Sequence, residues 1–262
     1  MKQVFFLSGL PRSGSTLLGS LLAQNPKFTV TPTSPLLDLF CYLSEGLALL
    51  HKQYTFDISA VADRVYRGIA STYHEDIRTD YVLDKHRGHP KNVDALRRYF
   101  GAEPKIICTN RPVAEVLTSY LSLMARQSGK PNFVDSHLRQ KGLAQTTENR
   151  ARCLWENFVY DPYLSMKIGL EGHKSNIHLV SYGELVGDTH ATLDGIYRFL
   201  GVDPHRHSLE NIENACAEEK DAMWGLEGLH VIRPSVSRES APPQSVLGQY
   251  LTDYYNRFSL CG

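Results

Sequence analysis

The most constraining feature of the sequence is a short apolar run that leads into a loop with two glycines. Residues 4–16 read Val-Phe-Phe-Leu-Ser-Gly-Leu-Pro-Arg-Ser-Gly-Ser-Thr, and leucines at positions 17, 18, 21 and 22 continue at helical spacing. This pattern predicts a strand, a tight loop from Gly9 to Gly14, and a helix. Such a loop points several backbone N–H groups at one place, and the helix dipole adds positive potential there. The segment therefore predicts a binding site for a phosphate-like anion.

The loop follows the spacing of a nucleotide phosphate loop with one change. Gly9, Gly14 and Thr16 match the pattern G-x-x-x-x-G-K-[ST], but Ser15 stands at the lysine position and the cation is Arg12, inside the loop. Because the lysine that contacts the β- and γ-phosphates is missing, the pattern does not favour ATP. An ordinary tight turn between a strand and a helix is the alternative. The density of anion donors in Pro-Arg-Ser-Gly-Ser-Thr argues against it.

Length and charge bound the class of protein. The chain has 262 residues, 42% of them hydrophobic, and 28 basic residues balance 28 acidic ones. This length predicts a single domain over residues 1–262, with helical insertions around residues 35–75 and 125–170. The balanced charge gives no indication of nucleic acid as a partner. No stretch approaches the length of a membrane span.

The cysteines indicate the redox compartment. They are odd in number, widely spaced and without a C-x-x-C pair: Cys41, Cys108, Cys153, Cys216 and Cys261. This usage predicts reduced thiols, a cytoplasmic location and no zinc site.

Strand-like and helix-like segments alternate along the rest of the chain. Apolar runs at residues 81–83, 105–109 and 176–181 are expected to be strands, ending near Asp84-Lys85, Arg111 and Tyr182. Helical spacing is found at residues 113–124 and 193–200, with Gly201 as a stop, and over roughly residues 35–50, 58–74 and 145–170.

This alternation predicts the fold. It indicates an α/β protein with a P-loop-like, three-layer α/β/α arrangement, a central parallel sheet and right-handed crossovers. In such folds the ligand site lies at the carboxyl ends of the strands. The anion loop, Asp84-Lys85, Arg111 and Tyr182 all follow strands, so we expect them to meet at one edge of the sheet.

A second anion site is predicted at Arg111 and Ser119. Arg111 closes a strand, and Ser119 lies in the helix that follows, on the same face as Pro112 and Glu115. A guanidinium fork beside a hydroxyl suits a phosphate monoester. A surface arginine and a helix serine without a shared ligand are the alternative, which the nearby anion loop makes less favourable.

These two motifs together resemble a known family. Gly-Leu-Pro-Arg-Ser-Gly-Ser-Thr followed by Arg-x7-Ser is similar to sulfotransferases that use 3′-phosphoadenosine 5′-phosphosulfate (PAPS), above all the branch with tyrosylprotein sulfotransferases and many bacterial and phage enzymes. The resemblance implies that the loop binds the 5′-phosphosulfate and that Arg111 and Ser119 bind the 3′-phosphate. The loop residues concerned are Pro11, Arg12, Ser13, Gly14, Ser15 and Thr16.

Weaker likenesses follow along the chain to residue 247. Asp84-Lys85 resembles the pair that ends the family's second strand, whose lysine faces the sulfuryl group. Tyr182 corresponds to a tyrosine near the adenine. Residues 199–201 resemble the family's Phe-Leu-Gly stop. His230 and Arg233 open a segment like the one that closes over the nucleotide.

The implied chemistry is transfer of a sulfuryl group to an acceptor hydroxyl or amine, without a metal. Arg12 and Lys85 would stabilise charge on the bridging oxygen, and the N–H groups of residues 13–16 would hold the phosphate. The sequence departs from the family pattern at the proton acceptor, because residues 31–35 hold no carboxylate where tyrosylprotein sulfotransferases have a glutamate. The candidate bases are His86, His89, Asp84 and Asp38, and histidine fits best by its pKa.

Two other functions remain open at the level of sequence. A phosphotransferase would use the apolar strand ending at Asp84 as a Walker B element. A nucleotide-binding protein without catalysis would account for the missing glutamate. The acceptor is a small molecule, a glycan, a lipid or a peptide, and residues 31–80 and 125–160 are expected to shape its pocket. Trp155 and Tyr160 are expected in the core or in that pocket's wall.

Overall fold

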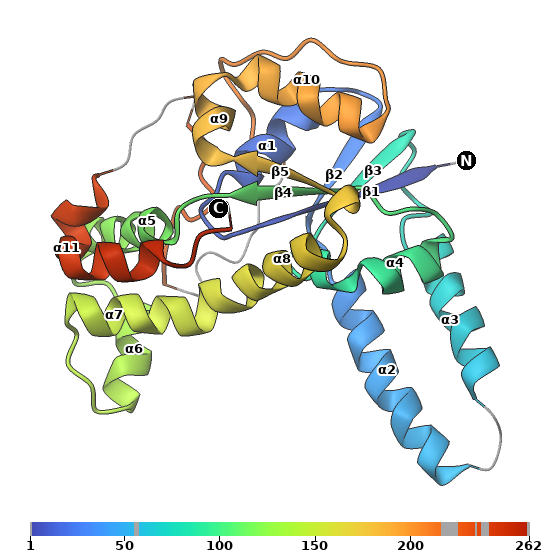
Figure 1. The fold of residues 1–262 in the computed structure, drawn as a ribbon, viewed down its shortest axis with the longest axis horizontal. Coiled ribbons are helices and arrows are strands. Elements are labelled where there is room, and N and C mark those ends of the chain that lie inside the picture. The colour runs from blue at the N-terminus through green and yellow to red at the C-terminus, as the bar shows by residue number, and fades with distance from the viewer. Residues whose placement is uncertain (1, 55–57, 216–224, 234, 237–240, 261–262) are drawn as a thin grey trace.

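A parallel five-stranded sheet forms the centre of the molecule. The computed structural model describes residues 2–54, 58–215, 225–233, 235–236 and 241–260 (Figure 1). The strands are arranged in the order β2-β3-β1-β4-β5, and every neighbouring pair is parallel. Their bounds are β1 Gln3–Gly9, β2 Phe28–Thr33, β3 Tyr81–Lys85, β4 Ile106–Asn110 and β5 Ile177–Ser181. The predicted α/β fold with a central parallel sheet is confirmed, and β1, β3, β4 and β5 lie where the apolar runs predicted them.

Side chains of the central strand alternate between two cores. Phe6 of β1 packs with one cluster, whereas Phe5 and Leu7 pack with the other. Because a parallel sheet is covered on both faces, its inner strands are apolar on both sides. The strands are thereby held rigidly, with their carboxyl ends at one edge.

Helices cover both faces of the sheet (Figure 1). The helices α1, α9 and α10 contribute to the core on one face, and α4, α5, α8 and α11 contribute to the core on the other. Their bounds are α1 Ser15–Leu22, α4 Val93–Phe100, α5 Val113–Arg126, α8 Tyr160–Gly172, α9 Tyr182–Gly187, α10 Thr189–Leu200 and α11 Pro243–Asn256. The helix predicted before Gly201 is confirmed, and Gly201 caps it in the left-handed conformation that glycine favours.

Two helical regions extend from this layered body. The helices α2 Leu36–Gln53 and α3 Ser59–Thr72 form a hairpin that projects away from the sheet in Figure 1 and has a small core of its own. The helices α6 Phe133–Gln140 and α7 Thr147–Leu154 lead into a π-helical turn at Trp155–Val159 and then into α8. Helix was predicted for most of these ranges, but the π turn was not. Trp155 packs against rings of α8, α11 and Phe258, as a core residue does.

The first strand after α1 was missed by sequence reasoning. The segment Phe28–Thr33 reads Phe-Thr-Val-Thr-Pro-Thr, and Phe28 and Val30 face the core while the threonines alternate with them. Pro32 is tolerated because β2 is an edge strand and pairs only with β3. The short alternation therefore indicates an edge strand after all, and its polar half concealed it.

Candidate functional site

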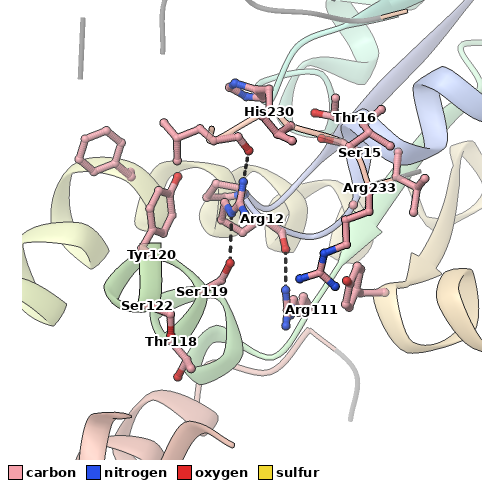
Figure 2. Close-up of a pocket in the computed structure, with 18 of the residues that line it drawn as sticks. Arg12, Ser15, Thr16, Arg111, Thr118, Ser119, Tyr120, Ser122, His230 and Arg233 are labelled. Carbon is pink, nitrogen blue, oxygen red and sulfur yellow. Dashed lines mark hydrogen bonds between the residues drawn. The ribbon is translucent and has the colours of Figure 1, made fainter. Parts of the chain in front are cut away.

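A cavity of about 790 Å³ opens at the carboxyl ends of the strands. Its walls come from the loop after β1, the end of β3, the helix α5, Tyr182 and residues 229–233 (Figure 2). Among the described lining residues six are basic and none is acidic: Arg12, Lys85, Arg87, Arg111, Arg126 and Arg233. A neutral chain therefore has a strongly positive cavity, as binding of an anionic ligand requires.

The loop after β1 has the backbone conformation that its glycines permit. Gly9, Arg12 and Gly14 have positive φ angles of 142°, 60° and 93°. A Cβ atom on Gly9 would lie 2.4 Å from the carbonyl oxygen of Thr109, so only glycine allows β1 and β4 to approach this closely. Pro11, Gly14, Ser15 and Thr16 then line the cavity at the N-terminus of α1.

Ser13 requires a correction, because its side chain turns into the core. Its hydroxyl donates to the carbonyl of Leu10 and lies 2.6 Å from Oγ1 of Thr109, and the residue is fully buried. The hydroxyl was expected among the anion donors. Only the backbone N–H of Ser13 is left for that role, and the side chain instead fixes the loop to β4.

Arg111 lies beside the loop, as its position after β4 predicted. It is 5% exposed, its Nη1 donates to the carbonyl oxygen of Arg12 at 3.1 Å, and its Nε donates to Glu115 at 3.1 Å. Its guanidinium carbon lies 4.3 Å from the ring centre of Tyr182. Its Nη2 is buried and has no hydrogen-bond partner. A buried cationic donor without a partner is costly, and an anionic oxygen in the cavity would satisfy it.

Arg12 connects three parts of the chain (Figure 2). Its Nε donates to Oγ of Ser119 at 3.1 Å, and its Nη1 donates to the carbonyl oxygen of Leu229. Ser119 belongs to α5, and Leu229 begins the segment that includes His230 and Arg233, which line the same cavity. The two predicted anion sites therefore form one continuous surface.

Lys85 and His86 stand at the end of β3. Lys85 is 8% exposed, and both residues line the cavity. His86 accepts a hydrogen bond at Nδ1 from the N–H of Gly88 at 3.0 Å, and its Nε2 lies 3.4 Å from Oδ1 of Asp38. Burial lowers the pKa of His86, and the charge of His89 lowers it further.

The expectation that Asp84 acts in catalysis is corrected by its burial. Its side chain is fully buried, and its two carboxylate oxygens lie 3.0 Å from Nε2 of His74 and 2.9 Å from Nε2 of His89. Burial alone would raise the pKa of this carboxyl, but the contacts with the two histidines outweigh burial and hold the pKa well below its usual range. Neither Asp84 nor His89 lines the cavity, so neither can receive an acceptor proton there or act as a Walker B carboxylate.

Several wall residues were missed by sequence reasoning. Ser122 and Arg126 continue the cavity-facing stripe of α5 at helical spacing from Ser119, a signal that was present in the sequence. Thr118 has a buried hydroxyl without a partner. Phe158 reaches the wall from the π-helical turn, 6.0 Å from the ring of Tyr120. No sequence pattern used here predicts such a turn, although π turns are frequent at functional sites.

Comparisons with known proteins identify the class. The model of the sulfotransferase family matches residues 4–206, most of the chain. The chain therefore belongs to the sulfotransferase family. It is a sulfotransferase, and the sulfuryl donor of this family is PAPS.

Solved structures agree on the fold. The sulfotransferase domain from the curacin biosynthetic pathway is 18% identical, aligns over 100% of this chain and 92% of its own, and has a TM-score of 0.52. A sulfotransferase domain from the Synechococcus PCC 7002 olefin synthase is 20% identical over 98% of this chain and 94% of its own, with a TM-score of 0.49. A mouse sulfotransferase complexed with PAP is 16% identical over 79% of this chain and 61% of its own, with a TM-score of 0.48. No curated protein sequence matches the chain significantly.

Two further searches of the described residues returned nothing. No group of three or more His, Cys, Asp or Glu side chains there is arranged to hold a metal ion. Within the same ranges, no helix has the length and apolar character needed to cross a membrane.

Proposed function

We propose that the cavity holds PAPS between the loop after β1 and the start of α5. The loop would bind the 5′-phosphosulfate, and Arg111 with Ser119 would bind the 3′-phosphate. The observation that carries this proposal is the buried Nη2 of Arg111, which has no partner although Nη1 is bonded to the backbone of Arg12. The positive lining of the cavity supports it, because the donor has anionic groups on both sides of its ribose.

Each cavity residue has a proposed part in holding the donor or stabilising charge. When bound, the donor supplies a sulfuryl group on a mixed anhydride. Arg12 and Lys85 stabilise negative charge as it grows on the bridging oxygen, and the N–H groups of residues 13–16 orient the 5′-phosphate. Tyr182 and Arg233 flank the nucleotide. Of the candidate bases, His86 lines the cavity and Asp38 contacts it, so the acceptor proton is assigned to this pair.

The acceptor is a hydroxyl or amine of a small molecule, a glycan or a peptide. The loop sequence Pro-Arg-Ser-Gly-Ser-Thr supports placement in the branch with tyrosylprotein sulfotransferases and bacterial and phage enzymes. The hairpin α2–α3 and the region from α6 to α8 would form the acceptor side of a single domain. The free thiols of Cys41, Cys108 and Cys153 support a cytoplasmic location.

Thermal unfolding with nucleotides tests the donor site. Adenosine 3′,5′-bisphosphate at about a hundred times its dissociation constant should stabilise the protein by about 2.7 kcal/mol, without added metal. ATP with Mg²⁺ should give a much smaller shift. Stabilisation by ATP with Mg²⁺ alone would instead support a phosphotransferase, and no shift with either would contradict the site.

Catalysis is tested separately, because a binding protein would pass the first test. Release of adenosine 3′,5′-bisphosphate from PAPS is measured with a panel of phenols, alcohols, amines, glycans and tyrosine peptides. Sulfation of one class identifies the acceptor. Tight binding of the bisphosphate without turnover across the panel would favour a protein that binds the nucleotide without catalysis.

A further inference from the structure

His86 and Asp38 form a pair that joins the cavity wall to the projecting hairpin. His86 follows β3 next to Lys85, and Asp38 lies in the first turn of α2. Nε2 of His86 lies 3.4 Å from Oδ1 of Asp38, and the two side chains are 18% and 55% exposed. The pair stands where an acceptor between the hairpin and the cavity would be in reach of both side chains.

The hydrogen bond from Gly88 fixes the neutral tautomer of His86. A backbone N–H can only donate, so Nδ1 of His86, which accepts it at 3.0 Å, must present its lone pair. A neutral imidazole carries one proton, which is then on Nε2 and faces Asp38. Burial and the charge of His89 lower the pKa of His86, although Asp38 and Asp84 act in the opposite direction. The ring is therefore neutral at pH 7.

In this tautomer His86 has no nitrogen that can take a proton. The lone pair of Nδ1 is used by Gly88, and Nε2 is already protonated. Asp38 has the free capacity that His86 lacks. Its Oδ1 faces Nε2 of His86, and its Oδ2 makes no hydrogen bond to any side chain or backbone group in the described ranges.

We infer that Asp38 takes the acceptor proton and that His86 is the residue that positions its carboxylate. This inference rests on the proposed sulfuryl transfer. In the step, the acceptor oxygen or nitrogen forms a bond to sulfur, and the bond between sulfur and the bridging oxygen breaks with its electron pair on the leaving phosphate. The acceptor proton goes to Oδ2 of Asp38. The N–H of His86 holds Oδ1 and favours the carboxylate rotamer that faces the acceptor.

The tautomer can be measured without an acceptor. Long-range ¹H–¹⁵N NMR of protein labelled with ¹⁵N-histidine distinguishes the two neutral forms, and His86→Gln assigns the signals by their loss. We expect the Nε2–H form, with and without adenosine 3′,5′-bisphosphate. The Nδ1–H form would overturn the inference. A protein that binds no bisphosphate would contradict the donor site but leave this measurement interpretable, so the two failures are distinguishable.

Kinetics then separate the two side chains. Turnover of PAPS is followed over pH with the best acceptor of the panel, or with water as acceptor if none is found. Asp38→Asn should lower kcat by about 10²–10⁴-fold and remove the fall in rate at acidic pH. His86→Gln keeps an N–H donor, so it should lower kcat by at most about tenfold and keep the acidic fall.

The reverse order of the two effects would overturn the inference, because a His86 base would be lost in His86→Gln. Glu45→Gln is the matched control: it removes one carboxylate from an exposed position two turns further along α2. It should change kcat by no more than about twofold, as surface substitutions do. A large loss in this control would assign the effect of Asp38→Asn to the helix and not to the proton.

Discussion

Arg111 is held on three sides, which leaves one nitrogen for a ligand. Glu115, the carbonyl oxygen of Arg12 and the ring of Tyr182 each contact the guanidinium. These contacts fix the orientation of a side chain that would otherwise lose much conformational freedom on binding. The binding strength of the cavity should therefore depend strongly on this residue.

Removal of Arg111 should weaken nucleotide binding. Arg111→Ala should lose about 1.5–3 kcal/mol of binding free energy for adenosine 3′,5′-bisphosphate, the range for a hydrogen bond to a charged group. Isothermal titration calorimetry measures this loss. Arg98→Ala, which removes an exposed arginine paired with Asp63 on the surface, is the control and should bind normally. Equal affinities of Arg111→Ala and the control would remove Arg111 from the site.

Lys85 should affect turnover more than binding. Its proposed interaction is with an oxygen that gains charge only as the donor bond breaks, so Lys85→Ala should lower kcat by about 10²–10³-fold. The dissociation constant of adenosine 3′,5′-bisphosphate should rise much less. Kinetics and calorimetry on the same preparation compare the two. A variant with weaker binding and normal kcat would show that the assigned role is wrong.

The residues of the site differ in how well the sequence predicts them. Arg111 was predictable because it closes an apolar strand, and parallel strands end at a common edge. Asp84 ends a strand as well, but its partner His74 precedes that strand and turns the carboxylate inward, which no local pattern indicates. Phe158 reaches the wall only through a π turn, so helical spacing misplaces it.

At the scale of elements, the strand, loop and helix around the anion site were the most predictable part. Their conformation is determined locally, by glycines that allow positive φ and by leucines that mark one helix face. The strand β2 was not predictable in the same way, because its pairing with β3 joins segments far apart in the chain. Tertiary contacts outweigh local propensity there.

Gly14 should tolerate no side chain. Its φ is 93°, and a Cβ atom would lie 3.0 Å from Cδ2 of Tyr182 and 3.1 Å from Cδ2 of Leu185. Gly14→Ala should therefore cost strain and packing, about 2–3 kcal/mol of unfolding free energy, and weaken bisphosphate binding by displacing Tyr182.

Gly101→Ala provides the matched comparison for this loop. Gly101 has a φ of 69° but no atom within 4 Å of an added Cβ, so it reports strain alone, about 1 kcal/mol. Denaturant unfolding of the two variants gives the difference. If Gly14→Ala were no less stable than Gly101→Ala and bound the bisphosphate normally, the close approach of Tyr182 to the loop would be contradicted.

At the scale of the whole molecule, the site depends on segments from nearly the full length of the chain. Arg12 near one end bonds to the carbonyl of Leu229 near the other, and the cavity lies between the two (Figure 2). Such closure comes from the packing of the two cores on the sheet, so the sequence indicated the likeness of residues 230–233 but not their contact with Arg12. Loss of global stability should therefore disrupt the site as well.

Acid should destabilise the whole fold in two steps. Burial, reinforced by the charge of His205, lowers the pKa of His207 to about 4, whereas an unfolded histidine has a pKa near 6.5. Between these values the unfolded chain binds the proton and the folded chain does not, so stability falls as the pH decreases from about 6.5 to 4. Asp84 has a lowered pKa, so its contribution is present above about 3.9 and is lost only below it.

The first of these steps can be isolated by substitution. His207→Gln removes the titrating ring next to Tyr197, so urea unfolding should lose about 1–2 kcal/mol less than the wild type between pH 6.5 and 4. Some acid sensitivity remains, because burial lowers the pKa of His86 and His178 as well. His51→Gln, at an exposed position on α2, should keep the full wild-type slope. If the His207 variant also kept that slope, the pH dependence would arise from the other buried groups, and His207 would be protonated in the folded protein as readily as in the unfolded chain.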